Sequence, residues 1–342
     1  MHWHRNENFR SLPWKLEKNP YRIWLSEIIL QQTRAEQGIP YYLRLIEQYP
    51  TLQHLADAND EEVFRLWQGL GYYNRCKNLL ATARFICVEL NGKFPDGHGS
   101  LLELKGVGEY TAAAIASFAF DLPHAVVDGN VTRLLSRYFA IDLPIDSSQG
   151  KKEFQRIAQE LLFEFDSAGY NQAIMDHGAM ICKPVAPHCA GCCFQKKCVA
   201  RQNGLINDLP VKSKKLKIRK RYFHYLILIS NGALWIRKRT KNDIWQNLHE
   251  PLLIESESPL DVKNIVKHPQ IVCYDFAVTP KFEGVLSQRL THQIIESRFF
   301  IVNLEQRFSN DDSDGFWVPI NELGNFAFPK TLVSFLEKKL YF

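Results

Sequence analysis

The sequence predicts a protein of two domains, an all-α domain over residues 1–210 and a smaller α+β domain over residues 222–342. Three observations support this division. Up to about residue 205, apolar residues recur at spacings of three and four, which is the period of amphipathic helices. Beyond residue 221, runs rich in β-branched and aromatic residues alternate with turn residues, as in strands. A short, strongly basic segment, residues 211–221, separates the two patterns.

The helical period and the strand-like runs give each element an expected range. Helices are expected at Tyr21–Gln37, Glu61–Leu66, Asn74–Leu90, Tyr110–Phe120, Val131–Ala140, Lys151–Phe165 and Asn171–Ile181. Strands are expected at Tyr222–Ser230, Ala233–Lys238, Ile271–Val278, Lys281–Leu290 and Ile294–Val302, with helical pieces near Leu260–Val266 and Lys330–Lys338.

The basic segment carries the whole excess of positive charge. The net charge is +5, and residues 211–221 hold seven Lys and Arg side chains and no acidic one. We expect this segment to be an interdomain linker that neutralises phosphates, with a merely solvated tether as the alternative. No run of 18 apolar residues occurs, and the N-terminus lacks the hydrophobic region of a signal peptide. A soluble, cytoplasmic protein without membrane contact is therefore expected.

Four cysteines have a spacing suited to an iron–sulfur cluster. Cys182, Cys189, Cys192 and Cys198 follow the pattern C-x6-C-x2-C-x5-C, and ligation by four cysteines is what a [4Fe–4S] cluster requires. A zinc site of four cysteines usually has two C-x2-4-C pairs with a longer spacer, whereas only one such pair is present here. The pattern favours [4Fe–4S], with zinc or unrelated thiols as alternatives. Cys193 falls outside the spacing.

Two glycines lie between helical segments, in the stretch Leu104–Ala112. Gly106 and Gly108 permit a tight hairpin whose backbone approaches another molecule closely, and the helix that follows offers free N–H groups to a phosphate. A plain turn between two helices is the alternative. Followed by x-x-T-A and an Ala-rich helix, the stretch resembles the helix–hairpin–helix element, which holds one DNA strand without reading its sequence.

Two carboxylates have contrasting surroundings. Glu27 lies among large apolar residues of a predicted helix, so burial should raise its pKa toward neutrality, as a general acid requires. Asp128 precedes a predicted helix, whose dipole should keep the carboxylate ionised. Such a pair is used to break glycosidic bonds. A surface Glu and a helix N-cap are the alternatives for these two residues.

Together these features resemble the helix–hairpin–helix DNA glycosylase superfamily with an iron–sulfur loop, and within it the MutY-type adenine DNA glycosylase family. The resemblance covers residues 9–205 almost continuously. The strings that carry it are Leu12-Pro-Trp14, Trp24-Leu-Ser-Glu-Ile-Ile-Leu-Gln-Gln-Thr33, Trp67-Gln-Gly-Leu-Gly-Tyr-Tyr73, Asp128-Gly-Asn-Val131 and Asn171-Gln-Ala-Ile-Met-Asp-His-Gly-Ala-Met-Ile-Cys182.

The resemblance implies a role for each catalytic candidate. Glu27 would protonate the adenine leaving group and later handle the attacking water, and Asp128 would stabilise the oxocarbenium-like sugar. Tyr110 and Asn130 would orient Asp128 or the water. Tyr110 stands where the related endonuclease III places a lysine that attacks the sugar. Since a phenol cannot form an imine, base release without efficient strand cleavage is expected.

The resemblance also implies how DNA is held. Gln32 and Tyr72 match residues that wedge into the duplex while the adenine is flipped out of the stack. Gly106 and Gly108 would grip one DNA strand. The implied partner is double-stranded DNA with an A:8-oxoG or A:G mispair, bound by a monomer associated with the nucleoid. Replication or mismatch-repair proteins are possible partners.

The second domain resembles the Nudix-like domain that recognises 8-oxoguanine in this family. The hydrolytic R-E-x-x-E-E cluster is absent from it, so binding without hydrolysis is expected. The lesion-sensing loop of the family reads Phe-Ser-His, and Leu290-Thr291-His292 fits it best, which assigns 8-oxoguanine recognition to Thr291 and His292. The alternatives to an adenine glycosylase are an endonuclease III-like lyase and a non-catalytic iron–sulfur DNA-binding protein.

Overall fold

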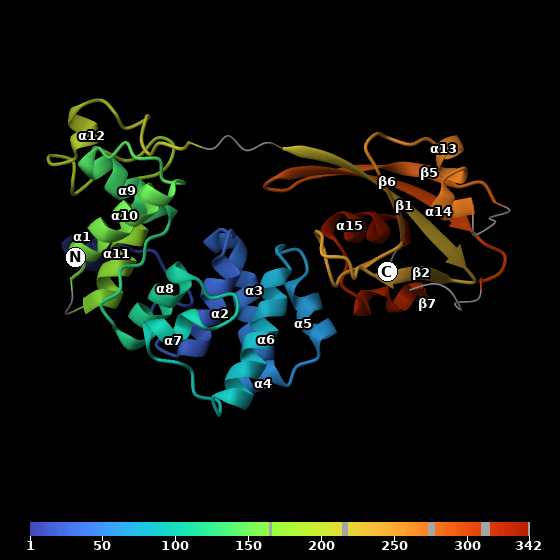
Figure 1. Ribbon diagram of the computed structural model, residues 1–342, viewed down its shortest axis with the longest axis horizontal. Coiled ribbons are helices and arrows are strands. Elements are labelled where there is room, and N and C mark those ends of the chain that lie inside the picture. Colours follow the sequence, from blue (N-terminus) through green and yellow to red (C-terminus); the bar gives the residue numbers. More distant parts are fainter. Residues whose placement is uncertain (164–165, 214–217, 273–277, 309–314, 341–342) are drawn as a thin grey trace. The chain divides into compact units, whose positions relative to one another are not determined.

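The computed structural model describes residues 1–342 apart from 164–165, 214–217, 273–277, 309–314 and 341–342 (Figure 1). The chain forms two compact units. The first comprises Met1–Asp57 and Lys77–Lys215, and the second comprises Ala58–Cys76 and Leu216–Phe342. The first is helical and the second contains a mixed sheet, so the predicted combination of an all-α with a smaller α+β domain is confirmed.

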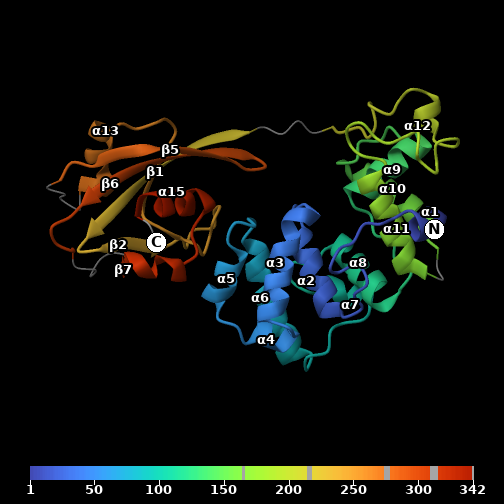
Figure 2. The same cartoon turned by 180° about the vertical axis from the view of Figure 1, so that it is seen from behind.

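The first unit consists of short helices packed around one another (Figures 1 and 2). Helix α2 packs against α3 and α8, and α9 packs against α10, α11 and α12. The helices are α1 (His2–Asn6), α2 (Pro20–Leu30), α3 (Ala35–Gln48), α4 (Leu52–Ala56), α6 (Asn74–Glu89, which begins in the second unit), α7 (His98–Leu102), α8 (Glu109–Phe120), α9 (Gly129–Phe139), α10 (Ser148–Glu160), α11 (Ser167–Met180) and α12 (Val199–Gln202).

The single helix expected over Tyr21–Gln37 is wrong, because the chain breaks it into α2 and α3. Helix α2 begins with Pro20 behind the N-cap Asn19, whose side chain accepts two backbone N–H groups. After Leu30 the chain leaves the helix, and Gln32 takes the left-handed φ of 59°. A continuous apolar period hid this break, since periodicity does not register one residue with positive φ.

The second unit is built on a seven-stranded sheet with the order β3-β2-β1-β6-β5, in which β4 also pairs with β1 and β7 with β2. Strands β1 and β6 run parallel, and the other pairs are antiparallel. The strands are β1 (Arg219–Ser230), β2 (Ala233–Lys238), β3 (His249–Glu250), β4 (Leu252–Ser256), β5 (Lys281–Arg289), β6 (Gln293–Asn303) and β7 (Gly315–Pro319). The helices are α5 (Asp60–Trp67), α13 (Val262–Val266), α14 (Pro269–Val272), η2 (Ile320–Asn325) and α15 (Lys330–Leu340).

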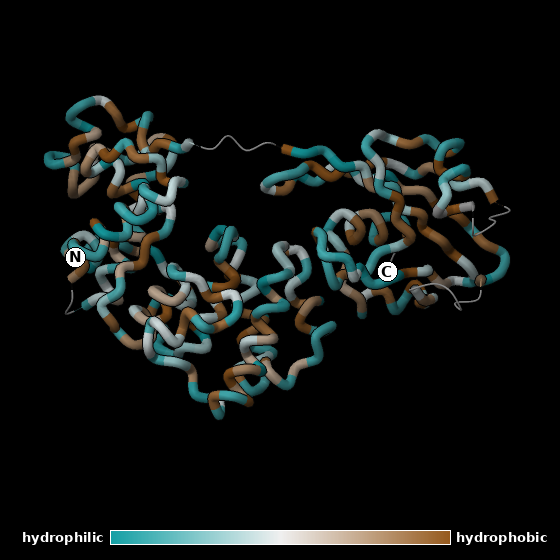
Figure 3. The backbone as a smooth tube through the Cα atoms, viewed as in Figure 1, coloured by the Kyte–Doolittle hydropathy of each residue, from teal (hydrophilic) through white to brown (hydrophobic). Residues whose placement is uncertain are grey.

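The central strands of the sheet carry the core of this unit. Side chains of β1, β2, β4 and β6 form one buried cluster that includes Leu226, Trp235, Ile254 and Phe300. Figure 3 shows hydrophobic residues along stretches of these strands. Burying them stabilises the unit by roughly 25 cal/mol for each Å² of apolar surface removed from water.

Two sequence expectations for this region need correction. The strand expected over Ile271–Val278 is wrong at its start, because Pro269–Val272 form α14, and residues 273–277 lie outside the described part. The expected linker, residues 211–221, is partly strand, since β1 begins at Arg219. Its residues 214–217 lie outside the described part as well. None of the helices in the described ranges has the length and apolar character that a membrane span requires.

Candidate active site

A pocket of about 1070 Å³ in the first unit brings together residues that are distant in the sequence. Glu27 reaches it from α2, Tyr110 from the first turn of α8, and Asp128 and Asn130 from the start of α9. Gln32, in the break between α2 and α3, lines the same pocket. Every residue proposed for the chemistry therefore faces one space.

Glu27 is buried in the wall of this pocket, with 4% of its surface exposed. Burial raises the pKa of its carboxyl group to about 7, and the charge of Asp128 acts in the same direction, whereas a hydrogen bond with Tyr110 opposes the rise. Its Oε2 atom is buried and has no hydrogen-bond partner among the described residues. A carboxyl group in this state can hold a proton near neutral pH and has an oxygen free to deliver it.

Tyr110 lies beside Glu27 and shares a hydrogen bond with its carboxyl group. Burial, together with the charges of Glu27 and Asp128, raises the pKa of the Tyr110 phenol well above its usual range. The phenol is therefore neutral at all physiological pH values and can donate its O–H to Glu27.

Asp128 caps helix α9. Its Oδ1 accepts the backbone N–H groups of Asn130 and Val131, both at 2.8 Å, and its Oδ2 accepts the side-chain amide of Asn130 at 2.7 Å. Burial raises the pKa of Asp128, while these three hydrogen bonds oppose the rise. Burial thus acts on this pKa against the helix end, which favours the ionised carboxylate. Asp128 is therefore both the N-cap of α9 and a lining residue of the pocket.

A buried arginine connects this carboxylate to the cysteine-rich loop. Arg133 donates from Nη2 to Asn130 Oδ1 at 2.8 Å and from Nε to the carbonyl oxygen of Cys182 at 2.7 Å. A chain of hydrogen bonds thus runs from Cys182 through Arg133 and Asn130 to Asp128. Sequence reasoning missed Arg133, because an arginine on an amphipathic helix has no pattern that separates a buried bridge from a solvated side chain.

The two hairpin glycines differ in what they require. Gly106 has the left-handed φ of 83°, and a Cβ built on it would stand 3.0 Å from Asn78 Cβ. Gly108 is the N-cap of α8 with φ −100°, and a Cβ there would meet nothing within 4 Å. The turn itself demands glycine at Gly106, whereas the open space at Gly108 leaves the backbone accessible to another molecule.

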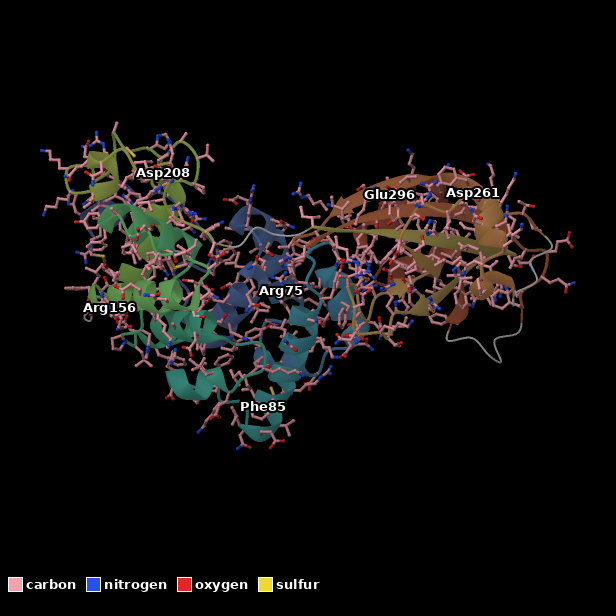
Figure 4. The ribbon with its side chains drawn as sticks, turned by 45° about the horizontal axis from the view of Figure 1, so that its top comes forward. Arg75, Phe85, Arg156, Asp208, Asp261 and Glu296 are labelled. Carbon is pink, nitrogen blue, oxygen red and sulfur yellow. The ribbon has the colours of Figure 1, made fainter. Side chains whose placement is uncertain are left out.

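Gln32 and Tyr72 share an uncommon backbone conformation. Their φ angles are 59° and 50°, and both side chains are exposed, Tyr72 by 48%. Non-glycine residues with a left-handed φ often occur at ligand-binding sites, where the strained backbone positions a side chain for its partner. Tyr72 belongs to the second unit, and Arg75 lies over its ring with a guanidinium-to-centroid distance of 5.4 Å; Figure 4 labels this arginine.

The second unit brings Tyr72 and Thr291 together, since their hydroxyl groups are hydrogen-bonded to each other. Thr291 and His292 form the exposed tip of the hairpin between β5 and β6. The carbonyl oxygen of His292 accepts the backbone N–H of Arg219 at 3.0 Å. Two residues singled out separately in the sequence thus meet at one point of the surface.

The four spaced cysteines line one small cavity in the first unit, and Cys193 is not among its lining residues. Within the described part of the chain, no group of three or more His, Cys, Asp or Glu side chains is placed to hold a single metal ion. A cubane cluster bears its cysteines on four separate irons, so its ligands surround a volume instead of a point. Four sulfurs around one cavity fit a cluster of that kind.

Two family models match the chain. The model of the HhH-GPD superfamily of base excision DNA repair proteins matches residues 25–162, and a NUDIX domain model matches residues 224–338. An adenine DNA glycosylase of Buchnera aphidicola subsp. Schizaphis graminum is 30% identical over 341 residues, covering 98% of this chain and 96% of that protein. The chain belongs to the adenine DNA glycosylase family.

A human relative and a solved glycosylase structure are also similar to the chain. The human adenine DNA glycosylase is 42% identical over 209 residues, which cover 58% of this chain and 38% of the human protein. A thermostable thymine-DNA glycosylase of known structure is 28% identical and superimposes with a TM-score of 0.54, covering 58% of this chain and 92% of its own. The protein is thus a DNA N-glycosylase of base excision repair.

The pocket also contains a group of charged side chains that the sequence did not indicate. Asp176 on α11 pairs with Arg10 at 2.8 Å and with Lys15 at 2.9 Å, and all three side chains line the pocket. Burial raises the pKa of Asp176, but hydrogen bonds from Lys15, Asn8 and Arg10 outweigh it and leave the pKa below its usual value. An aspartate in the middle of a helix gave no signal in the sequence, so this group was missed.

Proposed function

We propose that this adenine DNA glycosylase hydrolyses the N-glycosidic bond of adenine mispaired with 8-oxoguanine or guanine, after the adenine has been flipped out of the duplex, and that it does so without efficient strand cleavage. The observation that carries the proposal is the hydrogen bond between Glu27 and Tyr110 beside Asp128 in one pocket. The pocket thus holds a carboxyl group with a pKa of about 7, a phenol where a lyase has an amine, and a second carboxylate.

Glu27 is the proposed general acid. With a pKa of about 7, a large fraction of its carboxyl groups is protonated at neutral pH, and the unpartnered Oε2 can direct the proton at a ring nitrogen of adenine. Protonation turns adenine into a better leaving group. Once the base has left, the resulting carboxylate can accept a proton from the attacking water.

Asp128 is the proposed stabiliser of the sugar cation. The glycosidic bond breaks through an oxocarbenium-like state, and a carboxylate close to it lowers the energy of the positive charge in a site shielded from water. Asn130 fixes the carboxylate, since both its backbone and its side-chain nitrogen donate to Asp128. Tyr110 has no amine with which to capture the sugar, so the product remains an abasic site in an intact strand.

The polar wall of the pocket supports adenine as the base that enters. Adenine presents an exocyclic amine where guanine and thymine present a carbonyl oxygen. The Asp176 carboxylate can accept a hydrogen bond from that amine, whereas it would repel a carbonyl oxygen. Trp14, another lining residue, offers an aromatic face on which a flipped base can stack.

The contact between Tyr72 and Thr291 supports 8-oxoguanine as the opposite base. Guanine has an acceptor at N7, whereas 8-oxoguanine has an N–H donor there and an additional carbonyl oxygen. A hydroxyl group both donates and accepts, so Thr291 can bind the N–H of the lesion. Gln32 and Tyr72, with their left-handed turns, are the proposed wedges that hold the duplex open.

The same proposal includes a [4Fe–4S] cluster held by Cys182, Cys189, Cys192 and Cys198, whose side chains line one cavity. When bound, the cluster supplies four bonds that fix the loop, and a one-electron redox centre. The chain itself ties this loop to the active site, because Arg133 donates to the carbonyl oxygen of Cys182 and to Asn130.

Measuring base release on four matched duplexes tests this function. Each duplex has one adenine, placed opposite 8-oxoguanine, guanine, cytosine or thymine, and free adenine is quantified under single-turnover conditions. Release from the 8-oxoguanine and guanine duplexes, with the other two left intact, is expected. Equal release from all four would refute mispair recognition. An imine trapped by borohydride would favour a lyase, and tight binding with no release would favour a DNA-binding protein without catalysis.

A further inference from the structure

His177 is a buried histidine of α11 that the proposed chemistry does not use. Only 2% of its surface is exposed. The ring is enclosed by two aromatic side chains that meet it edge-on, Trp3 with a centroid distance of 5.0 Å and Phe194 with 4.9 Å. Enclosing a polar ring in this way costs free energy unless the ring nitrogens find partners.

The two ring nitrogens have different surroundings. Nε2 lies 3.6 Å from Cys192 Sγ and 3.5 Å from Cys193 Sγ. Nδ1 is buried and has no hydrogen-bond partner within the described residues. A neutral imidazole has one N–H, and the hydrogen bond that is available decides which nitrogen carries it. Since sulfur is the acceptor on offer, the proton belongs on Nε2, facing the two cysteines.

His177 also holds the first cysteine of the loop through its backbone. Its carbonyl oxygen accepts the N–H of Ile181 at 2.9 Å and the N–H of Cys182 at 3.0 Å. One residue therefore contacts Cys182 with its main chain and Cys192 with its side chain. These two cysteines are ligands in the proposed cluster, whereas Cys193 is exposed and does not line the cavity.

We propose that His177 is a positioning residue for the cluster, which donates a hydrogen bond from Nε2–H to the sulfur of Cys192 and thereby raises the reduction potential. The inference rests on the proposed [4Fe–4S] site. A cysteine thiolate bound to iron keeps negative charge and accepts N–H donors, and hydrogen bonds to the sulfurs tune the potentials of such clusters. The reduced cluster carries one more negative charge, so a donor at its ligand stabilises the reduced form more than the oxidised form.

Three substitutions separate the hydrogen bond from the packing of the ring. His177→Leu fills the space without a donor. His177→Gln places an amide nitrogen about where Nε2 stands, and His177→Asn places one about where Nδ1 stands. The full-length protein is used, and the readouts are the midpoint potential from voltammetry on an electrode and the iron and sulfide content per chain.

The proposal predicts a lower potential for His177→Leu and His177→Asn, and a potential close to wild type for His177→Gln. A tenfold shift of the redox equilibrium corresponds to about 59 mV for one electron, and we expect a shift of at least that order. Equal potentials in wild type and His177→Leu would overturn the proposal. If His177→Leu fails to take up the cluster, the comparison of His177→Gln with His177→Asn becomes the test. Equal potentials in these two variants would overturn the proposal.

Two further measurements keep the causes apart. Wild-type protein without iron and sulfide would refute the proposed cluster itself, whereas iron-loaded protein with unchanged potentials refutes only the role of His177. Cys193→Ala removes the competing sulfur and should leave the potential unchanged or raise it. A fall as large as that of His177→Leu would show that the potential depends on Cys193, and it would overturn the assignment of the effect to Cys192.

Discussion

The hydroxyl group of Tyr110 is hydrogen-bonded to the carboxyl group of Glu27, and the two side chains come from helices that are far apart in the sequence. Burial pushes the pKa of Glu27 up and this hydrogen bond pulls it down, with a balance at about 7. The phenol thus sets the strength of the acid as well as excluding an amine nucleophile.

The rate of adenine release should depend on the ionisation of Glu27. Because the protonated carboxyl group is the active form of a general acid, the single-turnover rate should be highest below pH 7 and fall about tenfold per pH unit above it. A raised carboxyl pKa also means that the folded protein binds the proton more tightly than the unfolded chain. Glu27 therefore contributes most to the free energy of unfolding below pH 4.5, the usual pKa of a glutamate, and this contribution is lost as the pH rises through about 7. A flat rate between pH 6 and 9 would contradict this role.

Replacing Tyr110 by Phe should shift this pH dependence upward. The hydrogen bond from the phenol lowers the pKa of Glu27, whereas burial raises it. Without the phenol, the effect of burial is opposed less, and the pKa of Glu27 should be higher. The decline in rate should then begin at a higher pH than in the wild type, as single-turnover rates across the pH range will reveal. Tyr170→Phe, a loss of a phenol outside the pocket, is the matched control. A shift to lower pH in Tyr110→Phe would contradict the hydrogen-bond geometry.

Replacing Asp128 by Asn should separate catalysis from helix capping. The Asn carbonyl oxygen can still accept the two backbone N–H groups of the cap, so the protein should fold, with a modestly lower melting temperature because the new amide nitrogen faces the side-chain amide of Asn130. The negative charge beside the sugar is lost, however, and the rate of base release should fall by at least ~10²-fold. Asp261 caps α13 through its side chain in the same manner and is labelled in Figure 4. Asp261→Asn is therefore the control that should keep full activity, and comparable rates in the two variants would refute the role of Asp128.

The two hairpin glycines should respond differently to alanine. Gly106→Ala forces an L-residue into a left-handed turn and against Asn78, which should cost about 1–2 kcal/mol in stability. Gly108→Ala fits the folded protein, since its Cβ meets nothing, yet it should weaken binding to an abasic-site duplex, because we propose that a DNA backbone is held at this hairpin. Thermal unfolding and a binding titration are the two measurements. Unchanged DNA affinity in Gly108→Ala would show that the hairpin does not contact DNA.

The sequence was informative wherever the chemistry depends on residue type and local spacing. Glu27 could be recognised because a carboxylate among apolar neighbours of one helix is unusual, and the structure buries it. Asp128 could be recognised because it precedes a helix, and it caps α9. The four cysteines could be grouped by spacing, and they line one cavity.

Features that depend on tertiary contacts could not be recognised in this way. Arg133, Asp176 and His177 lie on helices whose period makes them ordinary polar positions, and only the fold reveals that each is buried against a specific partner. The break at Gln32 was hidden by continuous apolar periodicity. Strand β3, with two residues, is too short for an alternating pattern to show.

The most direct test of the whole account compares wild type with Glu27→Gln in a single-turnover assay on a duplex with one A:8-oxoG pair, with alkali added to half of each sample. Glu160→Gln, on the exposed face of α10, is the matched control. The account predicts cleavage of the adenine strand only after alkali treatment, in wild type and Glu160→Gln but not in Glu27→Gln. Cleavage without alkali, or undiminished base release by Glu27→Gln, would contradict it.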